Sequence, residues 1–467
     1  MASTSISKQT SGTPTNNKKF TFSFWVKRNR LGTNQNVYIH ERGSGYGHTH
    51  KIEFGFHSSD SFFFGTWDGS SEYYSRTKRR FRDINSWMHV VIAVDSTDGT
   101  NTNRLKWYFN GEQYSIDGAM FDAGPSYPAQ DWVFNSNTWS HHIGRYVSSG
   151  GASNYLDACL TDFCFVDGQA LTPSSFGETD TDTGEWRVKD FAAGDITWGT
   201  NGYRILKDGI SLTDVSSNSH NFNADTGTLT KTLDNPNNVF ATWNVLDSHY
   251  FWGAEESSWC TNGNTTARSG NSQYSSCTAT LGASKGKYYW EFKYVAKSGS
   301  QNLWHLGIKS TQDTTSTNAL GEGATDYSYK AYNGQQMNNG SSSAYGSTYA
   351  VGDIIGIAMD LDNNKLYFSK NGVFQNSGDP TSGSTGTGAI SITDPASTVM
   401  GVYLPAWSWN DGSSYGTIEA NFGNGYFGTQ AITSNSGNGY QDADGNGKMN
   451  YSVPTGYRCL CTKGLNQ

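Results

Sequence analysis

The sequence predicts an all-β protein of two antiparallel β-sandwich domains joined by a connecting segment with short strands. Of its 467 residues, 14% are aromatic and only 16% are charged, and glycine occurs 54 times. Apolar and polar residues alternate in several segments, as in strands with one buried face. A helical period is nowhere sustained beyond a turn or two. Because the length suits two or three domains, we expect two sandwiches.

The first predicted strand lies near the N-terminus, where Phe20, Phe22, Phe24 and Val26 alternate with other residues. Further along, SWMHVVIAVD predicts a second strand, and RLKWYF leads into the dipeptide Asn110-Gly111. Asn-Gly between two strand-like runs is a strong short-range signal for a hairpin. The first domain is therefore expected to be built of antiparallel strands.

The second domain repeats the same pattern. The nearly continuous apolar run GDIIGIAMD is followed by a polar turn and by KLYFSK, which leads into Asn371-Gly372. Aromatic residues alternate in KYYWEFKY, and LWHLGIKS follows after a Ser/Gly turn as its expected antiparallel neighbour. These segments predict the strands of a second sandwich.

We expect the first domain at residues 20–175 and the second at residues 240–467, the latter with a closing strand at its C-terminal end. Residues 176–239 hold short apolar clusters between Asn, Asp, Gly and Ser, which favours an ordered connecting segment over a flexible linker. Residues 1–19 are rich in Ser, Thr, Asn and Lys. We interpret them as an N-terminal arm, either disordered or ordered only against a partner chain.

Charge and hydropathy exclude several classes of protein. The formal net charge is -8, so we expect no diffuse basic field for nucleic acid. No segment approaches the roughly 20 apolar residues that cross a bilayer, so we expect no membrane insertion. The N-terminal segment lacks the apolar core of a secretory signal, which argues against Sec export. Six cysteines are too few for a disulfide scaffold in this length, and Cys459 and Cys461 are expected to be buried thiols.

Two family resemblances follow from these segments. Residues 20–175 resemble the laminin-G/concanavalin A-like lectin domain, through FTFSFWVKR, SWMHVVIAVD, NRLKWYFNG and LTDFCFVDGQALTPSSFG. The part from about residue 240 resembles a SPRY domain, through KGKYYWEFKY, LWHLGIKS, GDIIGIAMDLDNNKLYFSKNG and IEANFG. Both resemblances imply jelly-roll or concanavalin A-like sandwiches that bind ligands.

Three further segments resemble lectin-like structural proteins of tailed bacteriophages, especially marine ones: GQALTPSSFGETDTDTGEW, LDNPNNVFATWN and VPTGYRCLCTKGL. This resemblance implies a non-enzymatic virion protein, such as a tail fibre, head fibre or capsid decoration component. It would assemble in the host cytoplasm and be extracellular after lysis. Its partners would be other virion proteins and a host cell-surface glycan or receptor. Strand edges and exposed aromatic residues also favour a homo-oligomer.

Two alternative functions stay open. A purely structural subunit would bury its loop aromatics in subunit contacts and bind no glycan. A polysaccharide depolymerase would need two carboxylates about 5 to 5.5 Å apart, and the Glu-x-Asp-x-x-Glu strand of laminarinase-like enzymes is missing. Glu291 and Glu419 are expected to be isolated carboxylates on solvated strand faces. We therefore predict that the protein is not an enzyme.

The candidate ligand-binding residues are aromatic residues in Gly/Ser-rich loops of the second domain and two polar neighbours. Aromatic faces stack on sugar rings and form hot spots in protein interfaces. Because Trp407 and Trp409 have the same parity, they are expected to form one exposed platform; alternatively, they plug the end of the sandwich. The set comprises Trp252, Trp259, Tyr327, Tyr329, Tyr332, Trp407, Trp409, Asn410, Asp411 and Tyr415.

Two groups of residues have the spacing of metal ligands. His48 and His50 are expected to face His40 across a hairpin, where imidazoles would bind zinc or nickel. Cross-strand hydrogen bonds or exposure are the alternatives. Asp442, Asp444 and Asn446 have the spacing of the first ligands of a calcium loop. Its last glutamate is missing, so a Gly-rich turn is the alternative. No cofactor is required, and calcium stays open.

Overall fold

The chain forms two compact units in the computed structural model. The structure describes residues 4–10, 12–42, 50–67, 70–114, 127–131, 140–148, 151–207, 209–249, 259–270, 275–311, 319–409, 414–432 and 440–465. Unit 1 comprises Met1–Lys231 with Asn235–Asn237, and unit 2 comprises Thr232–Asp234 with Asn238–Gln467. Each unit is a sandwich of two mainly antiparallel sheets, which confirms the predicted all-β fold.

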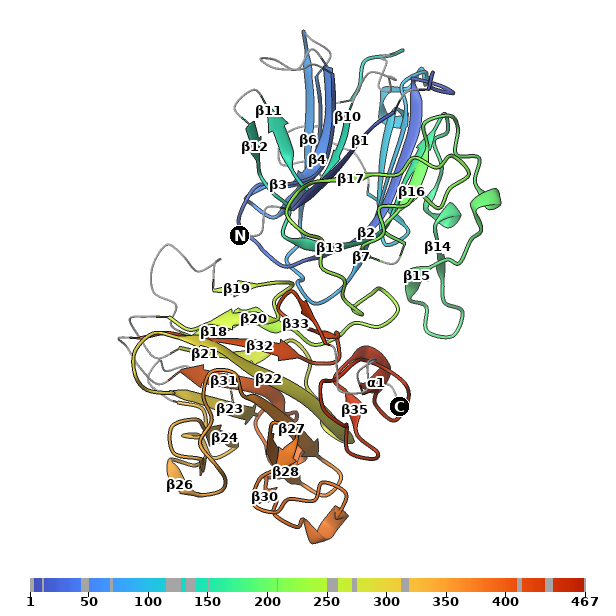
Figure 1. Ribbon diagram of the computed structural model, residues 1–467. Coiled ribbons are helices and arrows are strands. Elements are labelled where there is room, and N and C mark those ends of the chain that lie inside the picture. Colours follow the sequence, from blue (N-terminus) through green and yellow to red (C-terminus); the bar gives the residue numbers. More distant parts are fainter. Residues whose placement is uncertain are drawn as a thin grey trace. The chain divides into compact units, whose positions relative to one another are not determined.

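Unit 1 contains two large sheets that face each other (Figure 1). Within the described residues, sheet A has the order β17 (Asn223–Thr226), β1 (Ser5–Gln9), β10 (Ser140–Ile143), β3 (Gln35–Arg42), β4 (His50–Phe56), β5 (Ser61–Trp67) and β6 (Glu72–Arg80). Sheet B has the order β16 (Tyr203–Ile205), β13 (Ala158–Asp167), β2 (Lys19–Arg28), β7 (Met88–Asp95), β8 (Leu105–Phe109) and β9 (Glu112–Tyr114). Two hairpins accompany them: β11 (Tyr146–Ser148) with β12 (Gly151–Ser153), and β14 (Gly177–Thr179) with β15 (Trp186–Val188).

Aromatic rings fill the space between sheets A and B. Phe24 of β2 stacks on Phe54 of β4 with ring centroids 5.6 Å apart. Phe62 of β5 meets Trp107 of β8 edge to face at 5.9 Å. All four side chains are buried, and each such pair contributes about 0.5–1.5 kcal/mol beyond the burial of its area. The alternation that predicted β2 therefore sets the core-facing positions of that strand.

The outer face of sheet B is covered as well, which the one-sided alternation of β2 did not predict. Trp25 on that face is buried and stacks on His89, and Trp186 of β15 lies beyond His89. A Cβ atom at Gly111 would lie only 2.5 Å from the ring of Trp186. Asn110 and Gly111 both have positive φ, as the predicted Asn-Gly hairpin turn requires. Gly111 thus serves the turn and the close approach of the indole.

The N-terminal arm that we expected at residues 1–19 contains a strand of sheet A. β1 pairs with β10 on one side and with β17 on the other, and Ile6 is buried in the core. Backbone pairing on both edges and burial of Ile6 order this segment without a partner chain. Strands of the expected connecting segment, residues 176–239, also belong to unit 1, because β16 and β17 pair with β13 and β1.

Unit 2 is a second two-sheet sandwich (Figure 1). In its described part, sheet C has the order β18 (Trp243–His249), β21 (Ser275–Ala279), β31 (Leu404–Trp409), β23 (Trp304–Lys309), β24 (Asp326–Lys330), β25 (Gln335–Asn338) and β26 (Ser341–Ala344). Sheet D has the order β19 (Cys260–Thr261), β20 (Thr266–Arg268), β32 (Gly416–Asn421), β22 (Lys287–Lys297), β27 (Ile354–Asp360), β28 (Lys365–Lys370) and β29 (Val373–Phe374), while β30 (Ile390–Ser391) pairs with β28 and β35 (Arg458–Cys459) with β22. A small hairpin joins β33 (Tyr426–Phe427) to β34 (Gln430–Ala431).

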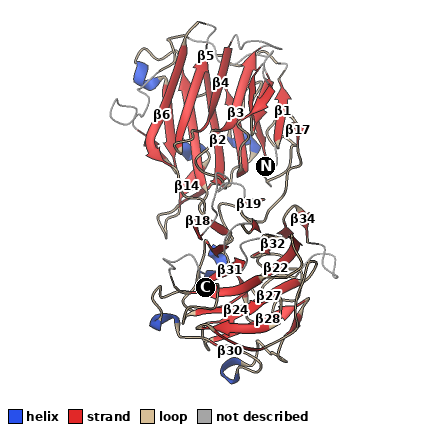
Figure 2. Ribbon diagram, turned by 90° about the vertical axis from the view of Figure 1, so that its left-hand side faces the viewer, coloured by secondary structure: helices blue, strands red, loops and turns tan. Residues whose placement is uncertain are grey.

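Helical segments are short and lie outside the sheets (Figure 2). They are η1 (Asn101–Asn103), η2 (Pro173–Ser175), η3 (Ala193–Asp195), η4 (Gly383–Thr385), η5 (Pro395–Ser397) and α1 (Thr462–Leu465). None of the helices in the described ranges is long and apolar enough to cross a membrane.

Three histidines are buried in the described part of unit 1. His40 of β3 stacks on His141 of β10 with ring centroids 4.1 Å apart, and His141 Nδ1 lies 2.7 Å from the hydroxyl of Tyr38. His89 lies beneath the β14–β15 hairpin. Burial lowers the pKa of His89 and of His141 to about 3, and it lowers the pKa of His40 well below its ordinary value. All three rings are therefore neutral at neutral pH.

This burial predicts that unit 1 loses stability in mild acid. The lowered pKa values mean that the unfolded chain binds protons at pH values where the folded unit does not, so the free energy of unfolding falls as the pH drops below 6.5. Between pH 6.5 and about pH 5, His89 and His141 each contribute on the order of 2 kcal/mol to this loss. Urea denaturation at several pH values across this range measures the slope of the unfolding free energy against pH. We expect His89→Gln to reduce the slope by about one proton; equal slopes in variant and wild type would contradict the prediction.

Candidate functional site

The expected tryptophan platform lies in the core of unit 2. Trp407 and Trp409 of β31 are fully buried, and the ring of Trp304 on β23 lies 5.1 Å from the first and 5.0 Å from the second. The Trp409 Nε1–H donates to the carbonyl of Ser414 at 2.9 Å. β31 is an inner strand of sheet C, so the parity that aligns the two indoles directs them toward sheet D. The prediction of an exposed platform is therefore wrong, and the plug alternative fits.

Three other members of the predicted aromatic set are buried for the same reason. Trp259, Tyr327 and Tyr329 belong to the core, and the two tyrosine hydroxyls bond within the unit, to Thr393 and to the carbonyl of Ser347. Residues that pack a sandwich are not available to stack on a ligand. Trp252, Asn410 and Asp411 lie outside the described residues.

Tyr332 and Tyr415 are the members of the set that reach the surface in the described part of unit 2. Tyr332 lies in the turn between β24 and β25 and is 46% exposed. Tyr415 is partly buried, and the guanidinium of Arg268 lies over its ring at 3.9 Å. Both tyrosines lie at the end of the sandwich where β31 finishes and β23 begins, because Tyr415 follows Trp409 and the backbone N–H of Ala331 donates to the carbonyl of Trp304.

We call this end of unit 2 the loop end and define it by residues 331–334, 346–353, 371–373 and 414–415. Its connections are hydrogen-bonded to one another: Tyr349 N–H donates to the carbonyl of Ala331, and Ser347 N–H donates to Oε1 of Gln375 at 2.9 Å. Two apolar side chains stand out on it, Val351 at 47% and Val373 at 67% exposure. Together with Tyr332 they give the loop end an exposed apolar character.

Asp353 holds two of these connections in place. Its carboxylate accepts hydrogen bonds from Ala350 N–H at 2.9 Å and from Asn371 Nδ2 at 2.7 Å, and Lys370 Nζ lies 3.1 Å away. Burial alone would raise the pKa of Asp353, but these hydrogen bonds and the lysine lower it below its ordinary value. The apolar side chains are therefore presented by a fixed backbone, which reduces the entropy cost of binding a partner.

Glu291 is buried and anchors the C-terminal part of unit 2. The expectation of a solvated carboxylate is wrong because residues 440–461 cover this face of sheet D. Its two oxygens accept hydrogen bonds from the backbone N–H groups of Asn450 at 2.8 Å and Tyr451 at 2.7 Å, and from Asn421 Nδ2 at 3.2 Å. Burial outweighs these bonds and raises the pKa of Glu291 to about 7. With its oxygens occupied by the fold, Glu291 is a structural carboxylate.

A serine–histidine contact in unit 1 does not have the geometry of a hydrolase. Ser23 Oγ lies 2.8 Å from Nε2 of His89, and the Nε1–H of Trp186 donates to Nδ1 of the same ring at 2.9 Å. An indole N–H only donates, so Nδ1 is an acceptor and the proton of the neutral ring is on Nε2. A ring protonated at Nε2 cannot accept the serine proton. The pair is a buried structural contact.

The proposed metal ligands are used by the fold or lie apart. Asp442 accepts hydrogen bonds from the backbone N–H groups of Asp444, Asn446 and Cys459, and Asp444 pairs with Arg458. The Asp442 loop is thus a self-satisfied turn, as the second interpretation expected. His40 stands opposite Ile52 on β4 and stacks on His141, so its position differs from the facing arrangement that we expected with His50.

No three His, Cys, Asp or Glu side chains converge on a metal position in the ranges that the structure describes. His48 lies outside these ranges. The structure records His50 as the first residue of β4, opposite Arg42.

Comparison with known families assigns both domains. Residues 3–175 match the concanavalin A-like lectin/glucanases superfamily, and residues 287–389 match the SPRY domain. The chain contains both of these domains. They resemble binding domains rather than enzymes, and the loop end lies in the SPRY-containing unit.

The similarity to individual proteins is limited in extent. Ran-binding protein 9 of Danio rerio is 31% identical over 96 residues, which is 20% of this chain and 16% of that protein; Ran-binding protein 10 of the same species is 32% identical over 96 residues, with the same coverage. The chain thus spans 16% of the length of these curated relatives. Among solved structures, the SPRY domain of human HERC1 is 16% identical, with 38% of this chain and 96% of that chain covered and a TM-score of 0.30. A heptameric SAP-like pentraxin from Limulus polyphemus is 16% identical, with 37% and 72% covered and a TM-score of 0.26.

Sequence reasoning missed Val351 and Val373 of the loop end. Val351 precedes a glycine in YAVGD, and Val373 follows Asn371-Gly372. A valine at the edge of a predicted tight turn can stay outside the core even where its backbone is paired, as that of Val373 is with Lys370, and this is the signal that would have found both. The loop-like aromatic residues that the sequence favoured instead are mostly needed for the core of unit 2.

Truncation of Trp409 should destabilise the SPRY-containing unit strongly. Trp409→Ala leaves a cavity beside Trp304, and large-to-small changes of this kind cost about 3–5 kcal/mol. Urea denaturation of the variant and of the wild type gives the difference in unfolding free energy. Tyr332→Ala, at an exposed position, is the control and should cost less than about 1 kcal/mol. Equal unfolding midpoints for Trp409→Ala and wild type would place Trp409 at the surface and contradict its position here.

The buried carboxyl group of Glu291 predicts that the stability of this unit changes with pH in the opposite direction to that of unit 1. Its pKa is about 7 when folded against 4.5 ordinarily, so the folded state holds the proton more tightly. The stability from this group is fully present below pH 4.5 and is lost as the pH rises through 7, an effect of about 3 kcal/mol. Glu291→Gln should flatten the slope of unfolding free energy against pH between about pH 5 and pH 8. Glu291→Gln also loses a hydrogen bond, which lowers stability at every pH. The slope, rather than the unfolding free energy at one pH, is therefore the quantity to compare. An unchanged slope would rule out Glu291 as the titrating group.

Proposed function

We propose that the chain is a non-enzymatic virion protein that binds a receptor on the host surface through the loop end of unit 2. The observation that carries the binding role is the apolar surface of Tyr332, Val351 and Val373 on connections that Asp353 holds in place. Exposed apolar groups grouped on a preorganised surface are typical of protein interaction sites.

The chemistry of the loop end favours a protein receptor over a glycan. Sugar recognition by stacking needs open aromatic faces, and the two tryptophans expected to supply them are buried. Two valines and one tyrosine fit an apolar patch of a protein. Glycan binding and a purely structural contact with other virion proteins are the competing functions.

The virion assignment rests on the three segments that resemble lectin-like structural proteins of tailed phages. Mass spectrometry of purified particles from an infected culture that encodes this chain tests it directly. We expect the chain among the particle proteins, in a repeated copy number if it forms the proposed homo-oligomer. Its presence only in the soluble lysate would overturn the virion role.

Loss of apolar groups at the loop end should weaken adsorption. We expect Tyr332→Ala combined with Val351→Ser to reduce binding of the full chain to host cells at least tenfold, with no change in unfolding midpoint. The matched control is Val399→Ser, which is 86% exposed and lies at the other end of the sandwich, since Thr398 contacts Ser310 beyond the end of β23. Protease treatment of the cells should abolish binding. Binding lost only after glycosidase treatment would favour the glycan function, and unchanged binding by the double variant would overturn the loop end as the site.

A further inference from the structure

A concentrated run of positive charge lies on unit 1, whereas the residues that the proposed function uses belong to unit 2. Five of the seven residues from 76 to 82 are basic. We call them the basic strip: Arg76, Lys78, Arg79, Arg80 and Arg82. Lys78, Arg79, Arg80 and Arg82 are exposed. The whole chain carries a net charge of -8, so the strip is a local reversal of sign that the overall charge conceals.

The first four residues of the strip belong to β6, which is an edge strand of sheet A in the described structure, and Arg82 comes just after it. Ser75 and Thr77 are buried and Arg76 is partly buried, whereas Lys78, Arg79 and Arg80 are all exposed, because the pairing of β6 with β5 is irregular between Arg76 and Arg80. Lys78, Arg79 and Arg80 follow one another directly, so three exposed cations are concentrated at the end of this strand. Arg79 lies beside Phe81, with its guanidinium 5.1 Å from the ring. Lys78 and Arg79 form no ion pair with any residue that the structure describes.

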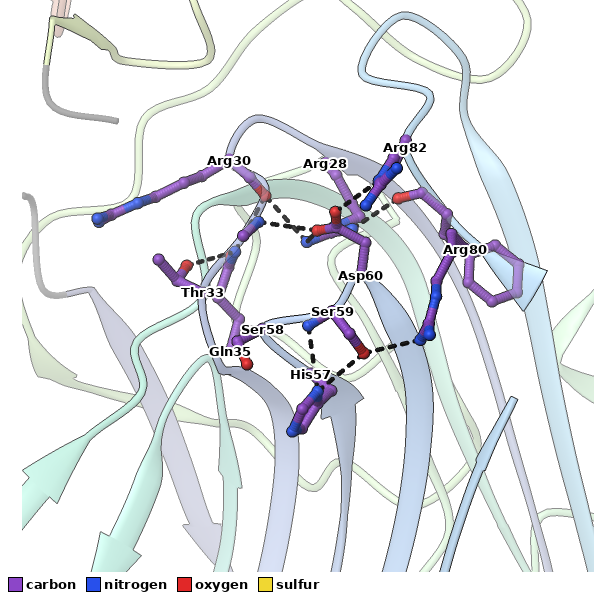
Figure 3. A network of polar contacts seen from close by, with 12 residues as sticks. Arg28, Arg30, Thr33, Gln35, His57, Ser58, Ser59, Asp60, Arg80 and Arg82 are labelled. Atoms are coloured by element: carbon purple, nitrogen blue, oxygen red, sulfur yellow. Dashed lines mark hydrogen bonds and ion pairs between the residues drawn. The ribbon is translucent and has the colours of Figure 1, made fainter. Parts of the chain in front are cut away.

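A buried ion-pair network fixes the end of the strip (Figure 3). Asp60, in the turn between β4 and β5, accepts hydrogen bonds from Gly32 N–H at 2.8 Å, from Arg28 Nη2 at 3.2 Å and from Arg82 Nε at 2.9 Å. Arg28 is buried, lies over the Phe56 ring at 4.3 Å and donates to the carbonyl of Phe81. The backbone between Arg80 and Arg82 is therefore held from beneath.

The same network leaves the strip positively charged. One carboxylate, Asp60, serves two arginines, Arg28 and Arg82, and the Arg82 side chain remains 63% exposed. Arg80 donates to the neutral Ser59 hydroxyl at 2.8 Å (Figure 3). Burial raises the pKa of Asp60, but its hydrogen bonds and the two guanidinium groups outweigh burial and keep that pKa below its ordinary value. Asp60 thus balances only part of the positive charge around it.

We propose that the basic strip binds an acidic polysaccharide, one that carries sulfate or carboxylate groups along a single extended chain. Four of the five cations are arginines, whose planar guanidinium groups bind sulfate and carboxylate through paired hydrogen bonds. A short run of cations at the end of one strand fits one narrow polymer. Duplex nucleic acid fits less well, because it places its charges over a broad surface, whereas the strip concentrates its cations at the end of one strand.

Charge on an edge strand also has a purely protective use, since it prevents association with another strand. That use is served by either sign of charge. Reversal of the sign at Lys78 and Arg79 therefore separates the two explanations: a protective strip stays functional, whereas an anion-binding strip fails.

The test uses the full chain and three polymers: dextran sulfate, polygalacturonate and neutral dextran. We expect both acidic polymers to bind, neutral dextran not to bind, and Lys78→Glu with Arg79→Glu to weaken binding of the acidic polymers at least tenfold. The salt dependence of binding should become correspondingly shallower. The matched control, Lys207→Glu with Lys285→Glu, makes the same change of net charge at two exposed lysines elsewhere and should bind as wild type does.

Three results would overturn the proposal. These are unchanged binding by the strip variant, an equal loss in the control variant, and displacement of dextran sulfate by a duplex or single-stranded oligonucleotide at lower charge concentration. The first leaves the strip as edge protection, the second makes net charge the cause, and the third makes nucleic acid the favoured ligand. Near-ultraviolet circular dichroism of each variant verifies that the sandwich is folded. Host-cell adsorption through the loop end should be unaffected in the strip variant, so the two sites fail independently.

Discussion

Burial of aromatic side chains between two facing sheets is the interaction on which both units depend. In unit 1 the contacts are chiefly between phenylalanines, such as Phe24 with Phe54, and in unit 2 they are between tryptophans, such as Trp304 with Trp407. These cores absorb most of the described aromatic residues. The side chains that both proposed binding sites use are therefore ones that the cores do not need: valines and a tyrosine at one end of the SPRY-containing unit, and basic residues on an edge strand.

The sequence predicted the strands whose residues alternate over a long stretch, because period-2 alternation reports a buried face directly. It also predicted the Asn110-Gly111 and Asn371-Gly372 hairpins, where only a positive φ fits the turn. It failed at LPAWSWN because Pro405, Ser408 and the surrounding Gly and Ser have the composition of a loop. The parity of the two tryptophans was correctly recognised. Parity alone, however, does not tell which face of a strand meets the other sheet.

Covering segments and local electrostatics account for the other misses. Glu291 has the parity of an outer face, as the alternation of KYYWEFKY implies, but residues about 160 positions later cover it, and no local pattern reports such a long-range contact. Asp442 has the spacing of a calcium loop, yet backbone N–H groups occupy its oxygens. Net charge is an average over the chain, so a value of -8 coexists with five cations in seven residues.

The closure of each sandwich by residues far apart in sequence determines when each unit can complete its fold during synthesis. In unit 1, β1 pairs with β17, and in unit 2, Phe240 pairs with Cys461 while Ala241 N–H donates to the carbonyl of Leu460. On a translating ribosome, sheet A gains its last strand once residue 226 has emerged, but unit 2 stays open until residue 461 has emerged. During that interval its strand edges and tryptophans are exposed to other nascent chains. Early termination would leave a folded unit 1 attached to an aggregation-prone remnant.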